Sequence, residues 1–256
     1  MDRLTFVSAT AVEAGELVLA MRDKNLEIGH KGDDRRDLVT NIDLEVDAFV
    51  RQKIQGAFPG ETVYSEEDSR EEKGARTYWS VDPIDGTANF ARGIPHFATV
   101  ISYVERGKVV AGAIYNPVTR ELWSVERGTG ASLNTKRVAV QDITRLEDAY
   151  VLLQIGRRAE TWDWGLRLKR AFLARAKKSL TLGSSALDLA FLASGRVDAV
   201  IYGTMTTTDI AGAIALVREA GGEVHDIDGN PVELRNVPQQ VIATATRTLF
   251  DQIRAL

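Results

Sequence analysis

The strongest constraint on the fold is a stretch of alternating polar and β-branched or aromatic residues between positions 97 and 140. Three turn-like segments interrupt it, Arg-Gly-Lys at 106–108, Asn-Pro-Val-Thr at 116–119 and Arg-Gly-Thr-Gly at 127–130. Successive side chains of a strand face opposite sides, and glycine- or proline-containing turns join neighbouring strands. The pattern therefore predicts an antiparallel meander.

Helical periodicity precedes this meander. Apolar residues three and four positions apart predict helices over 3–22 and 39–58, with Gly56 and Pro59 ending the second. A short strand is expected within 61–69, and another over 76–82 that Pro83 ends because proline cannot donate to a strand ladder.

After position 148 strands and helices alternate, with helices expected over 161–176, 185–195 and 209–221 and a last helix at the C-terminus. His225 is expected in a surface turn. We therefore expect a single unit over 1–256, with an α+β half at 1–147 that carries the meander and an α/β half at 148–256, and with helices packed on sheets.

Composition excludes several classes of function. The chain has 32 basic and 36 acidic residues, a formal net charge of -4, so it offers no overall field for nucleic acid or an anionic membrane. It has no cysteine, which excludes disulfides and cysteine nucleophiles. No apolar run is expected to reach the roughly 20 residues of a membrane span, and Glu13 and Glu16 interrupt the N-terminal segment. A cytoplasmic location is expected.

The segment WSVDPIDGTANF at 79–90 places Asp82 and Asp85 in one tight bend. Carboxylates this close raise each other's pKa, and a bound cation would compensate for their repulsion. Both side chains and the carbonyl of Ile84 can face one point, and oxygen ligands suit Mg²⁺. Gly86 and Thr87 open a short helix whose N–H groups can bind phosphate.

Three other segments support this interpretation: SEED at 65–68, TTTD at 206–209 and LGSS at 182–185. Each alone is explained as well by a solvated loop, a turn or a helix cap. No nucleotide-binding glycine motif, nucleophile elbow or zinc-protease motif is present, and only three histidines are available.

Together these segments resemble the inositol monophosphatase family of lithium-sensitive, Mg²⁺-dependent phosphatases. The matching segments are 37–43, 65–69, 79–98, 182–202 and 208–224, in the family's order and spacing. The resemblance implies an α+β fold, a layered αβαβα sandwich shared with fructose-1,6-bisphosphatase. It also implies a homodimer and a phosphoric monoester hydrolase of the inositol-phosphate type.

The resemblance also implies roles for individual residues. Two or three Mg²⁺ ions, or Mn²⁺ in their place, would be held by Glu67, Asp82, the carbonyl of Ile84, Asp85 and Asp209. Thr87 with Glu67 would activate the attacking water, and Asp43 would support a further metal through water. The substrate would contact Ile84, Asp85, Gly86, Thr87, Gly183, Ser184, Ser185 and Asp209.

Three positions depart from the inositol-preferring pattern, and they leave the substrate open. Tyr202 replaces an acid that contacts a sugar hydroxyl, Thr208 replaces a tryptophan, and Lys31 lies one position out of register. A small polyol or sugar phosphate is the expected substrate. Fructose 1,6-bisphosphate, histidinol phosphate and a 3′-phosphonucleotide are the alternatives within the same chemistry. A non-catalytic role, with the basic stretch 157–178 contacting the transcription machinery, is the alternative of another class.

Overall fold

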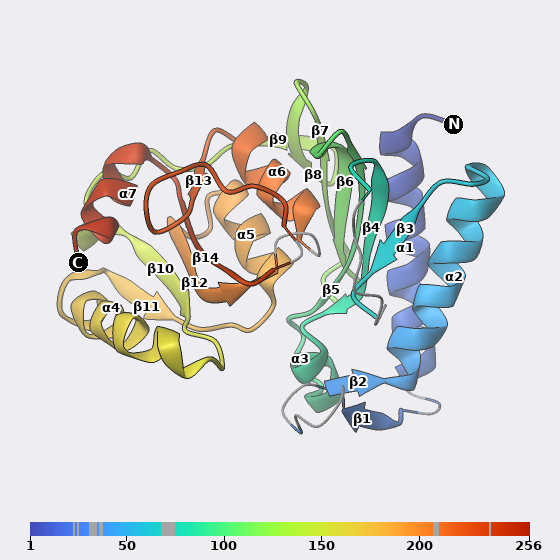
Figure 1. Ribbon diagram of the computed structural model, residues 1–256, viewed down its shortest axis with the longest axis horizontal. Helices are drawn as coiled ribbons and strands as arrows, with labels where there is room; N and C mark the ends of the chain where they lie inside the picture. Colours follow the sequence, from blue (N-terminus) through green and yellow to red (C-terminus); the bar gives the residue numbers. More distant parts are fainter. Residues whose placement is uncertain are drawn as a thin grey trace.

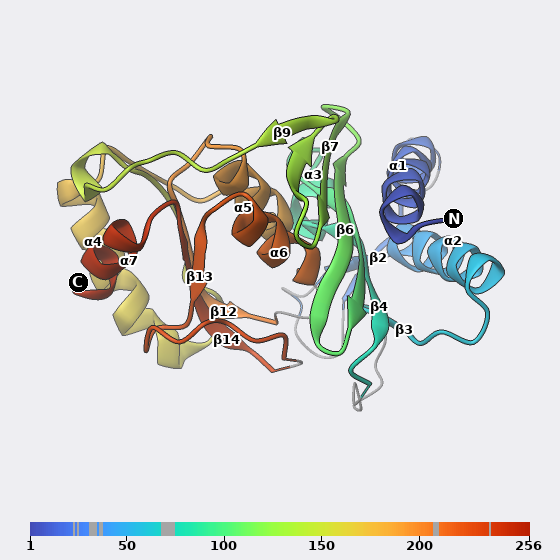
Figure 2. The same ribbon diagram turned by 90° about the horizontal axis from the view of Figure 1, so that it is seen from above.

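A computed structural model of the chain describes residues 1–256 except positions 23, 25, 31–34, 36–37, 68–74, 207–209 and 236. Its elements form five layers, helix, sheet, helix, sheet and helix, as Figures 1 and 2 show from two sides. The expected layered α+β sandwich is confirmed.

The larger sheet has seven strands and includes the predicted meander. In spatial order its strands are β3 (Val63–Ser65), β4 (Tyr78–Asp85), β5 (Ala98–Glu105), β6 (Lys108–Asn116), β7 (Glu121–Glu126), β8 (Gly130–Leu133) and β9 (Lys136–Val138). β3 pairs with β4 in parallel, and every other neighbouring pair is antiparallel.

The prediction that Pro83 ends its strand is wrong. β4 continues through Pro83 to Asp85, with an irregularity in its pairing to β5 between Asp82 and Asp85. Inside this bulge the Pro83 carbonyl accepts a hydrogen bond of 2.8 Å from the Thr99 hydroxyl. Proline is compatible with a bulge, where no ladder donor is needed, so the strand carries both aspartates to one end of the sheet.

Two antiparallel helices cover the outer face of the larger sheet, α1 (Arg3–Arg22) and α2 (Asn41–Ala57). The prediction that no apolar run could span a membrane is wrong for α1. Judged by its length and composition alone, this helix could cross a membrane. Here α1 buries Phe6, Val7, Ala11, Ala14 and Val18 in the core beneath the sheet, which is the position of an ordinary core helix.

The smaller sheet has five strands, in the spatial order β11 (Lys178–Leu180), β10 (Tyr150–Gln154), β12 (Ala199–Met205), β14 (Gln239–Thr244) and β13 (Glu223–His225). β10 pairs in parallel with β11 and β12, whereas β14 is antiparallel to its neighbours. His225 ends β13 and is buried against Phe250, so its expected place in a surface turn is wrong.

The remaining helices cover this sheet on both faces. α4 (Trp162–Arg175) and α7 (Arg247–Arg254) lie outside, and α5 (Ser185–Ala193) and α6 (Ala211–Glu219) lie between the two sheets. The short elements are β1 (Ile28–His30), β2 (Leu38–Thr40), α3 (Thr87–Arg92), η1 (Leu146–Asp148) and η2 (Ala159–Thr161).

A close contact fixes α6 on the larger sheet. A Cβ atom at Gly212 of α6 would lie 2.4 Å from the Ser102 Oγ atom, and one at Gly112 of β6 would lie 3.0 Å from the Gly212 Cα. Both glycines therefore allow the helix and the sheet to approach more closely than side chains would permit. The first residues of α6 are held at a fixed depth beside the larger sheet.

We expect Gly212→Ala to destabilise the protein by about 1–3 kcal/mol through overpacking, although alanine favours a helix. Gly56→Ala is the matched control, because Gly56 also lies in a helix but a Cβ there would meet nothing within 4 Å. That control should raise stability by up to about 1 kcal/mol. Urea unfolding monitored by circular dichroism measures both, and equal effects would contradict the contact.

Candidate active site

A cavity of about 670 Å³ opens where β4 ends, and the carboxylates predicted from the sequence line it. Asp82 and Asp85 contribute from β4, and Gly86 and Thr87 from the start of α3. Residues of the second half, among them Gly183, Ser185 and Ile210, line the same cavity. The cavity therefore lies at the boundary between the two sheets and is built from both halves of the chain.

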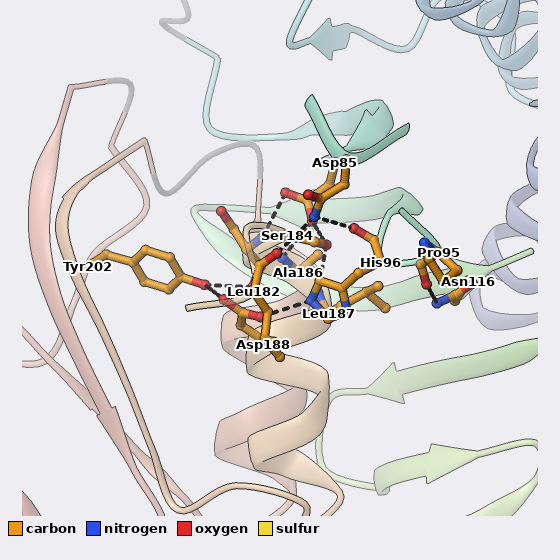
Figure 3. A network of polar contacts seen from close by, with 12 residues as sticks. Asp85, Pro95, His96, Asn116, Leu182, Ser184, Ala186, Leu187, Asp188 and Tyr202 are labelled. Atoms are coloured by element: carbon orange, nitrogen blue, oxygen red, sulfur yellow. Dashed lines mark hydrogen bonds and ion pairs between the residues drawn. The ribbon is translucent and has the colours of Figure 1, made fainter. Parts of the chain in front are cut away.

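Asp85 joins the two halves at this cavity. One of its carboxylate oxygens accepts hydrogen bonds from the Ser184 hydroxyl and from the Ala186 N–H at 2.9 Å, and the other accepts from the Ser185 N–H at 3.1 Å (Figure 3). These donors belong to the first turn of α5, where N–H groups lack partners within the helix. Asp85 thus caps a helix from the other half of the molecule.

Burial raises the pKa of Asp85 to about 6, and the nearby charges of Asp188 and Glu66 act in the same direction. The hydrogen bonds from Ser184 and Ala186 oppose this rise in pKa but do not cancel it. The Asp85 carboxylate is therefore held in a place that disfavours its negative charge, and a bound cation would reverse that preference.

The bend after Asp82 is held by its own hydrogen bonds. The Ile84 N–H donates to the Asp82 Oδ1 atom at 3.1 Å, and the Thr87 hydroxyl donates to the Ile84 carbonyl at 3.0 Å. Gly86 has a φ of 92°, a left-handed conformation that favours glycine, and it precedes the first residue of α3. The helix start predicted at Gly86 and Thr87 is present, facing the cavity.

The structure separates the two glutamates that follow β3. Glu66 lines the cavity, and its N–H donates to the Val81 carbonyl at 3.0 Å, next to Asp82. Glu67 is half-buried and is not among the residues that line this cavity, and its N–H donates to Ser65 Oγ at 3.3 Å. The acid beside Asp82 and Asp85 is therefore Glu66, one position before the glutamate that the sequence interpretation chose.

Other predicted site residues have varied positions. Gly183 and Ser185 line the cavity, but Ser184 is buried against Asp85 as the N-cap of α5. Asp43 is buried in a capping box at the start of α2, where its Oδ2 atom accepts from the Thr40 N–H at 2.7 Å. Asp209, and the departures Thr208 and Lys31, lie outside the described residues.

A buried polar chain behind α5 was missed by the sequence interpretation. Asp188 accepts a hydrogen bond from the Tyr202 hydroxyl at 2.9 Å and contacts His96 Nε2 at 3.0 Å (Figure 3). Burial raises the pKa of Asp188, whereas His96 lowers it. The signal in the sequence was an acid within the apolar run ALDLAFLA. The Tyr202 hydroxyl is thus turned toward α5, and Tyr202 does not line the cavity.

The wall of the cavity beyond β12 is polar and basic. Gln154, Arg157, Arg158 and Thr204 line it. Arg158 lies 3.5 Å from Glu160, and both of these side chains are exposed. The lining of the cavity therefore combines carboxylates with arginine side chains.

The residues present fit a divalent cation. Three carboxylates and a backbone carbonyl are hard oxygen donors, as Mg²⁺ prefers. Within the part of the chain that the structure describes, no three acidic or histidine side chains already converge on a single point. The three carboxylates instead surround the cavity, which leaves space for the water and substrate oxygens that Mg²⁺ usually retains.

In EDTA, where no metal is bound, the raised pKa of Asp85 should affect how the free energy of unfolding depends on pH. Its folded pKa of about 6 exceeds the reference value of 3.8, so between these pH values the folded state binds more protons than the unfolded state. Asp85 therefore contributes a fall in the free energy of unfolding as pH rises through this window, by at most about 1.4 kcal/mol per pH unit. Urea unfolding should show this contribution as a difference in pH slope between the unmodified protein and Asp85→Asn, and parallel curves for the two proteins would contradict the assignment.

Known proteins with similar sequences identify the family of this chain. The inositol monophosphatase family model matches residues 1–256. A Thermotoga maritima fructose-1,6-bisphosphatase/inositol-1-monophosphatase is 35% identical over 231 residues, 90% of this chain and 86% of that protein. A Nus factor SuhB of Vibrio cholerae is 35% identical over 195 residues, 75% of this chain and 73% of that protein.

A solved structure agrees with these sequence relatives. The chain superposes on a Thermotoga maritima IMPase with a TM-score of 0.89 and 30% identity, covering 100% of this chain and 96% of that one. The chain therefore belongs to the inositol monophosphatase family. It is an enzyme of the phosphatase class.

Proposed function

We propose that this protein hydrolyses a small phosphate monoester, a polyol or sugar phosphate similar to inositol 1-phosphate, with Mg²⁺ as its cofactor. The observation that carries the proposal is the convergence of Glu66, Asp82 and Asp85 on one cavity at the start of α3. A cytoplasmic homodimer inhibited by Li⁺ belongs to the same proposal. Light scattering and LiCl titration of activity test the dimer and the inhibition.

In this proposal Asp82, Asp85, the Ile84 carbonyl and Asp209 hold two or three Mg²⁺ ions, with Mn²⁺ as a substitute. Glu66 takes the place that the sequence interpretation gave to Glu67, because Glu66 lines the cavity. When bound, Mg²⁺ supplies Lewis-acid stabilisation of the phosphoryl oxygens and lowers the pKa of water.

The chain's own groups position the reactants. The Thr87 hydroxyl donates its hydrogen bond to the Ile84 carbonyl, so its lone pairs remain to accept a hydrogen bond from the attacking water. The N–H groups of Gly86 and Thr87 would bind the phosphate, and Asp43 would act at longer range through water. Water would attack phosphorus directly as the bond to the alcohol oxygen breaks, the proton that the water loses would be taken up by that oxygen, and the alcohol would leave past Gly183 and Ser185.

The basic wall of the cavity favours a second candidate, a bisphosphate such as fructose 1,6-bisphosphate. Tyr202 points away and offers no acid to a sugar hydroxyl, whereas Arg157 and Arg158 line the same cavity as the carboxylates. Guanidinium groups bind phosphate by paired hydrogen bonds, so they would hold a second phosphate on the leaving group. The Thermotoga maritima relative named above carries both activities in its name.

Phosphate release from a panel of esters tests these proposals. The panel contains inositol 1-phosphate, fructose 1,6-bisphosphate, histidinol phosphate and a 3′-phosphonucleotide, each with Mg²⁺ and with EDTA. The ratio of kcat/KM values identifies the preferred ester. Arg157→Gln should lower kcat/KM for the bisphosphate relative to kcat/KM for the monophosphate. Activity that survives EDTA would refute the metal-dependent mechanism.

An interaction role has one supporting observation. Trp162, Leu166 and Leu173 are exposed on α4, and their spacings of four and seven residues place them on one side of that helix. These three residues belong to the basic stretch 157–178. The Vibrio cholerae relative is called a Nus factor. Salt-dependent binding of the full chain to RNA would support this role, and no binding at low salt would end it.

A further inference from the structure

A second cavity of about 640 Å³ lies at the other end of β4, and residues of α6 help to line it. Tyr78, the first residue of β4, lines it, whereas Asp85, the last, lines the catalytic cavity. The seven residue steps between them span roughly 23 Å at strand geometry. We call this space the basic cavity, because five cationic side chains line it: Arg76, Arg106, Lys108, Arg127 and Arg218.

The two carboxylates in its lining already have partners. Glu219 accepts hydrogen bonds from the N–H groups of Gly128 at 2.8 Å and Gly130 at 3.1 Å. Glu233 pairs with Arg235 at 2.9 Å, and Arg235 is not in the lining. Neither hydrogen bonding nor ion pairing shown for these two carboxylates involves a cation of the lining, and the five cations outnumber them.

Four of the cations have no carboxylate partner in the described part of the chain. No acidic side chain there lies within 4 Å of the charged groups of Arg76, Arg106, Lys108 or Arg127. The fifth, Arg218, donates to the backbone carbonyls of Val224 at 3.3 Å and Val232 at 2.7 Å. Burial lowers the pKa of Arg218.

This gathering of positive charge stands out in a chain whose formal net charge is -4. Like charges around one concave space repel one another, and a low-dielectric wall concentrates their field there. The field favours an anion inside the cavity, where it could meet several guanidinium groups at once.

The rest of the lining is apolar and aromatic. The rings of Tyr64 and Tyr78 lie 4.8 Å apart, and Val109, Ile214 and Leu234 complete that wall. The volume is in the range of about 300–1,000 Å³ that is typical of small-molecule sites. The cavity thus offers charged groups for an anion and an apolar, aromatic wall beside them.

We propose that the basic cavity binds a small molecule with two or more phosphate groups on an apolar or aromatic body. The site is separate from the catalytic cavity, and α6 connects the two. Ile210, just before α6, lines the catalytic cavity, whereas Ile214 and Arg218 on α6 line the basic cavity.

Isothermal titration of the full chain with three probes tests this proposal, in EDTA and again with Mg²⁺. ADP has both phosphates and an aromatic body, pyrophosphate has only the phosphates, and adenosine has only the body. We expect one ADP per chain that persists in EDTA, weaker binding of pyrophosphate, and no binding of adenosine. No binding of ADP or pyrophosphate in either condition would overturn the proposal.

Two double variants test whether ADP binds in this cavity or to positive charge elsewhere on the surface. Arg106→Gln with Lys108→Gln removes two exposed cations from its lining and should weaken ADP binding by about tenfold or more. Arg145→Gln with Arg175→Gln removes the same charge from the residue before η1 and the last residue of α4, and it should change ADP affinity less than twofold. Equal losses in both pairs would overturn the site. Basal phosphatase activity serves as the check of folding, and its absence in the unmodified chain would refute the proposed function without affecting the ADP result.

Discussion

Asp82→Asn is expected to lower kcat/KM for phosphate release by about 10³-fold or more, which corresponds to about 4 kcal/mol of transition-state stabilisation. Asp82 lines the catalytic cavity at the end of β4, and asparagine would remove a negative charge that a divalent ion needs. The fold should survive, because the asparagine carbonyl can still accept the Ile84 N–H bond that Asp82 accepts.

The measurement is initial phosphate release across a range of Mg²⁺ concentrations, with circular dichroism as the check of folding. Asp142→Asn is the matched control, since Asp142 is exposed in the connection between the two sheets. It should retain the activity of the unmodified protein. A folded Asp82→Asn protein with full activity would remove Asp82 from the mechanism.

The second large effect distinguishes two adjacent glutamates. Glu66→Gln should lower kcat/KM by about 10²-fold or more and raise the Mg²⁺ concentration needed for half-maximal activity. Glu67→Gln should change either quantity less than threefold. The reason is position, because Glu66 lines the catalytic cavity next to Asp82 and Asp85 whereas Glu67 does not.

The two substitutions make the same chemical change at adjacent positions, so each is the control of the other. Both proteins should give similar urea midpoints, which would exclude a difference in folding. A large loss in Glu67→Gln with a small one in Glu66→Gln would restore the assignment made from the sequence and contradict the geometry.

Much of the fold follows from periodicity alone. Residues 3–22 repeat their apolar positions at helical spacing and form α1 at Arg3–Arg22, and the alternation at 97–140 forms β5 to β9. Tertiary context determined the exceptions. Pro83 lies inside β4 because a bulge removes the need for its missing donor, and the three residues of β13 are too few to show a period.

The site was predictable in composition but not in detail. The bend at Asp82 and Asp85 and the helix start at Gly86 were evident from residue types. Whether Glu66 or Glu67 faces the cavity depends on how the chain leaves β3, because neighbouring residues near a strand end point in different directions. The role of Ser184 was hidden for a similar reason, since its partner Asp85 lies 99 positions earlier in the chain.

The hydrogen bonds from residues 184–186 to Asp85 have a consequence for biosynthesis. The larger sheet is complete at Val138, so a ribosome-bound chain of that length already contains Asp82 and Asp85. Their geometry is finished only when α5 has emerged and docked. Catalytic activity should consequently appear late during translation, only after the second half of the chain has docked on the larger sheet.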